Sequence, residues 1–136
     1  MRLARQLGVL WGVALIPAMI TGAFTLRWKA ESDRVDLETV LAWDEPVLWV
    51  DARSRAAYGT AHWPEAVLLN LDEWDSLIPG FLDFWDPEKK IVVYCDSGAC
   101  RASEEVAERI RAEFGNKKVF VLEGGWDVLE AQSSTP

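Results

Sequence analysis

The chain has 136 residues, which suits a single domain, and its apolar share of 50% is ordinary for a globular protein. Its net charge of −8 is unevenly distributed, because residues 1–30 carry four basic side chains and no acidic one, whereas residues 31–136 carry 22 acidic and 10 basic ones. Such an acidic domain repels nucleic acid, and two cysteines with one histidine are too few for a closed zinc site or a disulfide framework.

An uncharged stretch of 20 residues, 7–26, lies between basic flanks near the N-terminus. A helix of this length, at about 1.5 Å per residue, spans a hydrocarbon core about 30 Å thick, so residues 1–30 are predicted to hold a single-pass membrane anchor. A cleaved signal peptide is the alternative, because residues 21–23 are small, although its apolar core would be unusually long. The basic flanks balance, and only the terminal amine favours a cytoplasmic N-terminus, which would place the domain outside the cytoplasm.

From residue 31 onward, four apolar runs have the composition of buried strands. Each run is short and rich in β-branched or aromatic side chains. A polar linker precedes them and ends near residue 35 in a small edge strand. The four runs are residues 47–50, 66–69, 91–94 and 119–122.

Helical patterns separate these strands. Asp36 can cap a helix with an acid-rich first turn, and a short helix opens the segment 54–64. Two helical pieces interrupted by Pro79-Gly80 are predicted within residues 72–84. Residues 101–114 repeat apolar side chains at spacings of three and four, which predicts an amphipathic surface helix.

The alternation predicts an α/β domain over residues 31–132, with a central parallel sheet of about five strands and helices on both faces. Ligands of such folds gather at the carboxyl ends of the strands. Asp51, Cys95 and Glu123 each follow a strand end, so we expect them at one edge of the sheet. Residues 133–136 are expected to form a disordered tail.

The loop between strand 91–94 and helix 101–114 contains both cysteines. Cys95 ends the strand, where unpaired backbone N–H groups and the helix dipole favour anions and therefore the reactive thiolate. This position predicts a nucleophile or sulfur carrier, and the alternative is a small buried hydrophobic residue. His62, the only histidine, is expected to be a turn residue rather than a general base.

Four motifs resemble those of the rhodanese family, in the right order and spacing over about residues 33–131. They are the strand 47–50 with its Asp-x-Arg turn (Asp-Ala-Arg, 51–53), the turn Ala-His-Trp-Pro-Glu-Ala (61–66), the active-site loop beginning Tyr-Cys-Asp-Ser-Gly (94–98), and the closing motif Val-Leu-Glu-Gly-Gly-Trp (121–126). The family forms of the second motif read Gly-His-Ile-Pro-Gly-Ala. The resemblance implies the three-layer rhodanese fold.

The resemblance also implies a sulfurtransferase, in which Cys95 accepts sulfane sulfur from an anion such as thiosulfate, holds it as a persulfide, and passes it to an acceptor. The expected partners are this donor, a thiol or protein acceptor and, through residues 7–26, a membrane; no nucleic acid, metal or cofactor is expected. Backbone N–H groups of the loop would hold the persulfide or the donor anion; the loop residues are Asp96, Ser97, Gly98, Ala99, Cys100 and Arg101.

Structural roles are expected for five further residues. The resemblance implies that Asp51 and Arg53 form an ion pair in the turn after a strand, and that His62 is part of a turn. The paired glycines Gly124 and Gly125 suit a positive φ or a close approach of two backbone segments.

The chain departs from the family pattern at the loop and at one turn. Cys100 occupies the sixth loop position and Arg101 the seventh, whereas the common loop has arginine at the sixth; Glu65 replaces a usual glycine. Asp96 opposes both thiolate formation and the approach of a dianion. Cys100 could resolve a persulfide or sulfenic acid on Cys95 as a disulfide if their Cα atoms lie within about 7 Å, or it could pack as a small residue under the loop.

Two other functions remain open from the sequence. The spacing Cys95-x5-Arg101 also matches the seven-position loop of phosphatases and arsenate reductases that share this fold, although no obvious general acid accompanies it. Alternatively, a non-catalytic module could dock a partner or sense redox state through Cys95 and Cys100.

Overall fold

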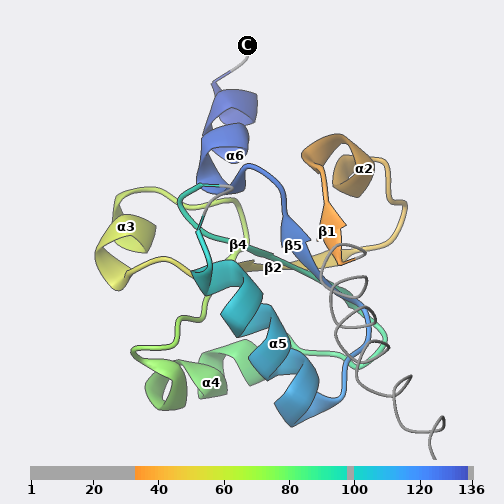
Figure 1. Ribbon diagram of the computed structural model, residues 1–136, viewed down its shortest axis with the longest axis vertical. Helices are drawn as coiled ribbons and strands as arrows, with labels where there is room; N and C mark the ends of the chain where they lie inside the picture. Colours follow the sequence, from red (N-terminus) through yellow and green to blue (C-terminus); the bar gives the residue numbers. More distant parts are fainter. Residues whose placement is uncertain (1–32, 98–99, 135–136) are drawn as a thin grey trace, which may run out of the picture. The chain divides into compact units, whose positions relative to one another are not determined.

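Five parallel strands form the centre of the domain (Figure 1). This computed structural model describes residues 33–97 and 100–134. The strands lie in the order β1-β5-β4-β2-β3, and every neighbouring pair is parallel. The predicted α/β class and central parallel sheet are therefore confirmed. The strands are β1 (Arg34–Val35), β2 (Val47–Asp51), β3 (Val67–Leu68), β4 (Lys90–Tyr94) and β5 (Val119–Leu122).

Helices cover both faces of this sheet (Figure 1). Helices α4 (Trp74–Leu82) and α5 (Ala102–Phe114) contribute buried side chains to the apolar cluster on one face. Helices α2 (Leu37–Leu41) and α6 (Gly125–Ser133) contribute to the cluster on the other face. The short helix α3 (Arg55–Thr60) follows β2 and buries none of its residues.

The central strand β4 shows how one strand serves both faces. Ile91 and Val93 belong to the cluster shared with α4 and α5, whereas Val92 and Tyr94 belong to the cluster shared with α2 and α6. All four are fully buried. Because successive side chains of a strand point to opposite faces and both faces are covered, the strand must be apolar throughout.

The register of β2 and β4 positions the loop that follows β4. The two strands pair from Val47 opposite Lys90 to Asp51 opposite Tyr94, so their carboxyl ends lie at the same level of the sheet. The amide of Ala52 donates to the carbonyl oxygen of Tyr94 at 2.8 Å, which continues the pairing beyond both strands. Cys95 therefore enters the loop directly beside the turn that follows β2.

Helix α4 differs from the sequence prediction, because residues 74–82 form one helix and not two pieces. Pro79 lies inside it and lacks the amide hydrogen that a helix interior uses. Trp74 and Phe81, on either side of this proline, are both buried in the core. Their packing outweighs the local preference of the Pro-Gly pair for a break, so the predicted interruption is wrong.

The C-terminal helix α6 was not predicted, and its last residue, Ser133, falls in the segment expected to be disordered. The hydroxyls of Ser133 and Ser134 both donate to the carbonyl oxygen of Glu130, at 2.9 and 2.8 Å. These bonds satisfy a carbonyl at the helix end and extend the ordered chain. The first two residues of the predicted disordered tail thus lie at the end of α6 and at its C-cap, and residues 135–136 lie outside the described part; disorder of the tail stays a prediction.

The predicted membrane anchor, residues 7–26, also lies outside the described residues. Within 33–97 and 100–134, no helix combines the length and the apolar composition needed to cross a membrane.

Candidate active site

The candidate site is the loop between β4 and α5, which begins with Cys95. The side chain of Cys95 is 1% exposed and belongs to the apolar cluster beneath α4 and α5. At the far end of the loop, Arg101 takes the N-cap position of α5 without a side-chain capping bond. Of the predicted loop residues, Gly98 and Ala99 lie outside the described part of the chain.

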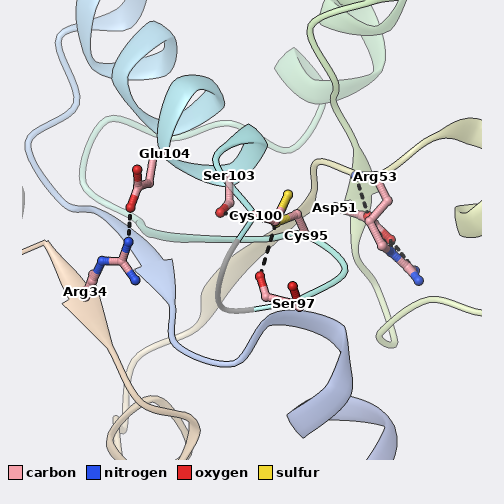
Figure 2. Close-up of a disulfide and its surroundings, with 8 residues drawn as sticks. All are labelled: Arg34, Asp51, Arg53, Cys95, Ser97, Cys100, Ser103 and Glu104. Atoms are coloured by element: carbon pink, nitrogen blue, oxygen red, sulfur yellow. Dashed lines mark hydrogen bonds and ion pairs between the residues drawn. A yellow bond between two sulfur atoms is a disulfide. The ribbon is translucent and has the colours of Figure 1, made fainter.

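A disulfide joins Cys95 to Cys100 across this loop (Figure 2). Their Cα atoms are 6.3 Å apart, inside the usual disulfide range of about 4.4–6.8 Å. The amide of Cys100 donates to the carbonyl oxygen of Ser97 at 3.1 Å, which holds the second cysteine close to the start of the loop. Cys100 is half-buried and also packs against the apolar cluster. The two roles considered for it, pairing and packing, are therefore combined.

Ser103 is a neighbour of Cys95 that the sequence analysis missed. Its side chain is buried, and its Oγ lies 3.5 Å from Cys95 Sγ (Figure 2). The hydroxyl can donate a hydrogen bond to the sulfur, and such a bond stabilises a thiolate or a persulfide anion. The signal was present in the pattern of α5, because Ser103 lies three and four residues before Val106 and Ala107 on the buried face.

The segment after β5 fixes the backbone of this loop. The amide of Trp126 donates to the carbonyl oxygen of Cys95 at 2.6 Å. Gly124 and Gly125 have φ values of 81° and 59°. A Cβ atom at Gly125 would collide with the Cys95 carbonyl oxygen and lie 3.0 Å from the Ser97 nitrogen. The two reasons for glycine that the sequence suggested, positive φ and close approach, thus apply together at Gly125.

Asp51 and Arg53 form a buried ion pair beside the loop (Figure 2). Arg53 Nη2 lies 2.7 Å from Asp51 Oδ2 and also donates to the carbonyl oxygen of Ala61 at 2.7 Å. The guanidinium stacks over the Trp126 ring, 4.3 Å from its centre. These contacts tie the turn after β2 to α6 and to the turn before β3, and they use the two charges structurally.

Tyr94 completes this buried network from the last position of β4. Its hydroxyl donates to Asp51 Oδ2 at 2.9 Å and accepts from the amide of Trp63 at 3.1 Å. Burial and the nearby charge of Asp51 raise the pKa of Tyr94 well above its ordinary value. The phenol therefore remains a hydrogen-bond donor at any physiological pH. In the sequence Tyr94 stands at the end of a buried strand and at the start of the loop motif, and neither pattern indicates this hydrogen-bond network.

The other titratable side chains singled out from the sequence are exposed to solvent. His62 is exposed, its Nδ1 lies 2.9 Å from the carbonyl oxygen of Tyr58, and its ring stacks on that tyrosine. Asp96 and Arg101 are exposed. Glu123 is exposed as well, and its backbone amide donates to the carbonyl oxygen of Val35 at 2.9 Å.

The electrostatics of the loop combine a helix N-terminus with acidic side chains. The positive end of the dipole of α5, a 13-residue helix, favours a negative charge near its first turn. Glu104 and Glu105 occupy that turn, and Glu104 forms an ion pair with Arg34 (Figure 2). No group of three or more His, Cys, Asp or Glu side chains in the described ranges could hold a metal ion. In its reduced form the site offers a buried thiol, a hydroxyl donor and a helix dipole.

Comparison with known proteins agrees with this geometry. The family model described as the rhodanese-like domain matches residues 34–132. That range includes all five strands, the cysteine loop and the closing segment up to most of α6. No curated protein gives a significant match to the chain.

Several solved structures share the fold. A protein from Bacillus halodurans superimposes with a TM-score of 0.62 and 23% identity, over 84% of this chain and 82% of the other. A rhodanese-like domain protein from Staphylococcus aureus gives 0.54 and 23%, over 70% and 88% of the two chains. A rhodanese-like domain from Anabaena gives 0.57 and 22%, over 76% and 84%. At these identities the likeness concerns the fold.

Proposed function

Because this chain belongs to the rhodanese-like domain family, we propose that it is a sulfurtransferase whose Cys95 carries sulfane sulfur as a persulfide. The observation that supports this most is the setting of Cys95 Sγ. Cys95 directly follows the buried strand β4, and the hydroxyl of Ser103, in the first turn of α5, lies 3.5 Å from Cys95 Sγ. Both surroundings favour a sulfur that bears negative charge.

The first half of the reaction needs a reduced Cys95 and a donor such as thiosulfate. The thiolate attacks the outer sulfur of the donor, a bond forms between Cys95 Sγ and that sulfur, and sulfite leaves with the electron pair of the broken S–S bond. Because the thiolate has already lost its proton, this step needs no general base. Ser103 and the α5 dipole stabilise the charge that now rests on the persulfide.

The disulfide supports a second candidate function, a reversible redox module. A pair with Cα atoms 6.3 Å apart can close and open with little movement of the chain. The phosphatase interpretation receives less support, because it needs Arg101 to face the loop, and Arg101 is exposed at the N-cap of α5.

We also propose that residues 7–26 tether the domain to a membrane, with the domain outside the cytoplasm. The uncharged length of this segment between basic flanks supports the tether, and the terminal amine supports the orientation. Cell membranes washed with alkaline carbonate should retain the full chain. Protease should digest the domain when it is added to cells whose outer layer has been made permeable and whose cytoplasmic membrane is intact. Release by carbonate contradicts the tether, and protection from protease contradicts the orientation.

The function is tested by intact mass of the full chain, reduced and freed of reductant. The Cys100→Ser variant isolates Cys95, and with thiosulfate it should gain ~32 Da, the mass of one sulfur atom on a thiolate. Cyanide should remove this gain as thiocyanate. The matched double variant, Cys95→Ser with Cys100→Ser, should gain nothing. If Cys100→Ser neither gains mass nor releases sulfite, the proposal is wrong.

A further inference from the structure

The two cysteines differ in access although they share one bond. Cys95 is 1% exposed, and its carbonyl oxygen is held by the amide of Trp126. Cys100 is half-buried and lies at the C-terminal end of the loop, immediately before Arg101 and α5. A thiol from outside the protein therefore meets Cys100 before it meets Cys95.

This difference matters for the sulfur that Cys95 would carry. The persulfide consists of Cys95 Sγ and one further sulfur, and an external acceptor thiol must reach it in a nearly closed site. Cys100 is already within bonding reach, because its own Sγ bonds to Cys95 Sγ in the structure. A neighbouring group in the same loop acts at an effective concentration that a free thiol at cellular levels does not reach.

We propose that Cys100 is the internal acceptor of this reaction, so that the domain releases the sulfur as hydrosulfide and closes the Cys95–Cys100 disulfide. The inference rests on the proposed function of Cys95. It names the product, which is hydrosulfide, and it requires a partner that reduces the disulfide before the next turnover. The disulfide is then the state that remains after one turnover.

The step balances in atoms and electrons. The thiolate of Cys100 attacks Cys95 Sγ, the Cys95–Cys100 bond forms, and the bond to the outer sulfur breaks. The outer sulfur, which is anionic in the persulfide, leaves with the electron pair of the broken bond and takes up the proton that the Cys100 thiol loses, so it departs as hydrosulfide. The two cysteine sulfurs together lose two electrons, and the sulfane sulfur gains them.

The next turnover needs a dithiol reductant of the kind that carries electrons between protein disulfides. Its thiolate attacks the more accessible sulfur, that of Cys100, and Cys95 leaves as a thiolate. The Ser103 hydroxyl, 3.5 Å from that sulfur, and the α5 dipole stabilise the leaving group. The reductant's second thiol then frees Cys100 and carries the electrons away as its own disulfide.

A single-turnover experiment on the full chain tests the inference. The reduced protein, freed of reductant, is mixed with excess thiosulfate, and sulfite, hydrosulfide and intact mass are followed together. The wild type should release one sulfite and one hydrosulfide per chain and end ~2 Da below the reduced mass, as a disulfide requires. Cys100→Ser should release one sulfite, no hydrosulfide, and retain the added sulfur.

Cys100→Ala repeats the test with a smaller side chain, and circular dichroism establishes that both variants are folded. With a dithiol reductant, hydrosulfide production by either variant should fall at least about tenfold, the minimum expected when an internal thiol becomes an external one. Cyanide should release the retained sulfur of either variant as thiocyanate, because cyanide attacks the outer sulfur directly, whereas the wild type should yield little thiocyanate after its sulfur has left as hydrosulfide.

The outcomes separate this inference from the function beneath it. A wild type that keeps the added sulfur and releases no hydrosulfide overturns the role of Cys100 and leaves Cys95 as a sulfur carrier. Hydrosulfide release by Cys100→Ser at the wild-type rate also overturns it. Absence of sulfite from the wild type and from both Cys100 variants instead defeats the proposed function itself.

Discussion

The amide of Trp126 donates to the carbonyl oxygen of Cys95 at 2.6 Å, so the cysteine loop is held by a segment that follows it by about 30 residues. The same tryptophan stacks on the Arg53 guanidinium, whose partner Asp51 ends β2. One residue thus joins the turn after β2 to the loop after β4. The shape of the cysteine loop depends on contacts outside it.

Gly125→Ala tests this dependence. The added Cβ would meet the backbone of Cys95 and Ser97, and the positive φ of 59° disfavours any side chain. We expect a loss of at least about 1–2 kcal/mol in the free energy of unfolding, together with slower sulfite release from thiosulfate. Urea denaturation measures the first effect.

Gly80→Ala is the matched control, because a Cβ there meets nothing within 4 Å. Gly80 lies inside helix α4, so this change should stabilise the protein by about 0.5–1 kcal/mol. If the two substitutions shift the urea midpoint in the same direction, the close approach at Gly125 is not what limits stability.

Glu65 adopts a φ of 64°, where the related turn carries glycine. A side chain at positive φ costs about 1–2 kcal/mol, because its Cβ crowds the following carbonyl oxygen. Glu65→Gly should therefore raise the free energy of unfolding by about 1 kcal/mol, less the extra entropy that glycine gives the unfolded chain. Asp44→Gly, at another exposed acidic position with an ordinary φ, should not be stabilising. Equal effects of the two changes would show that Glu65 is unstrained.

The two tyrosines, Tyr58 and Tyr94, should resist ionisation in the folded protein. Burial, with the negative charge of Asp51, raises the pKa of both phenols, and more strongly for Tyr94. Because the folded protein holds the phenol proton more tightly than the unfolded chain does, the protonated phenol contributes fully to stability below the unfolded pKa of about 10. This contribution is lost as the pH rises from there towards the pKa of the folded protein.

An alkaline titration followed by tyrosinate absorbance checks this expectation. We expect little tyrosinate near pH 10, where free tyrosine is about half ionised, and a cooperative rise when the protein unfolds at higher pH. Tyr94→Phe should flatten the alkaline loss of stability more than Tyr58→Phe does. A gradual, non-cooperative rise centred near the free value would contradict the burial argument.

The buried pair of Asp51 and Arg53 should require the guanidinium shape. Lysine keeps the charge at position 53, but it cannot donate both to the carboxylate and to the carbonyl oxygen of Ala61 in the same fork. Arg53→Lys should cost about 2 kcal/mol, the loss of hydrogen bonds to a charged group.

Arg55→Lys is the control, because the Arg55–Glu73 pair is largely exposed and should contribute less than about 1 kcal/mol. Thermal unfolding of the two variants side by side measures the contrast. If Arg55→Lys lowers the stability as much as Arg53→Lys does, burial does not determine how much the Asp51–Arg53 pair contributes to stability.

The strands and the position of the cysteine loop were predictable, because their causes are local. A run such as residues 91–94 is apolar on both faces only where a sheet is covered on both faces, and the cysteine follows that run directly. The sequence also indicated that residues 124–125 must be glycine. It did not indicate that the backbone of Cys95 is what approaches Gly125 closely.

The features that were missed depend on distant packing. Helix α4 passes through Pro79 because Trp74 and Phe81 are buried against other elements, which no local preference reveals. Ser103 is ordinary as a residue type at a helix start, and only its place on the buried face of α5 brings its hydroxyl to the sulfur. Tertiary contacts override local preference at Pro79, and at Ser103 they give an ordinary helix residue a neighbour outside its own helix.

Strand β1, the first element of the domain, pairs with β5, near its end, through Arg34 opposite Val121 and Val35 opposite Leu122. Synthesis proceeds from the N-terminus, so the nascent chain must present its cysteines before the strand and the tryptophan that shape their loop have left the ribosome. Cys95 and Cys100 thus acquire their different degrees of burial only when translation of the domain is complete. Premature termination before Trp126 would leave two ordinary thiols, open to indiscriminate oxidation.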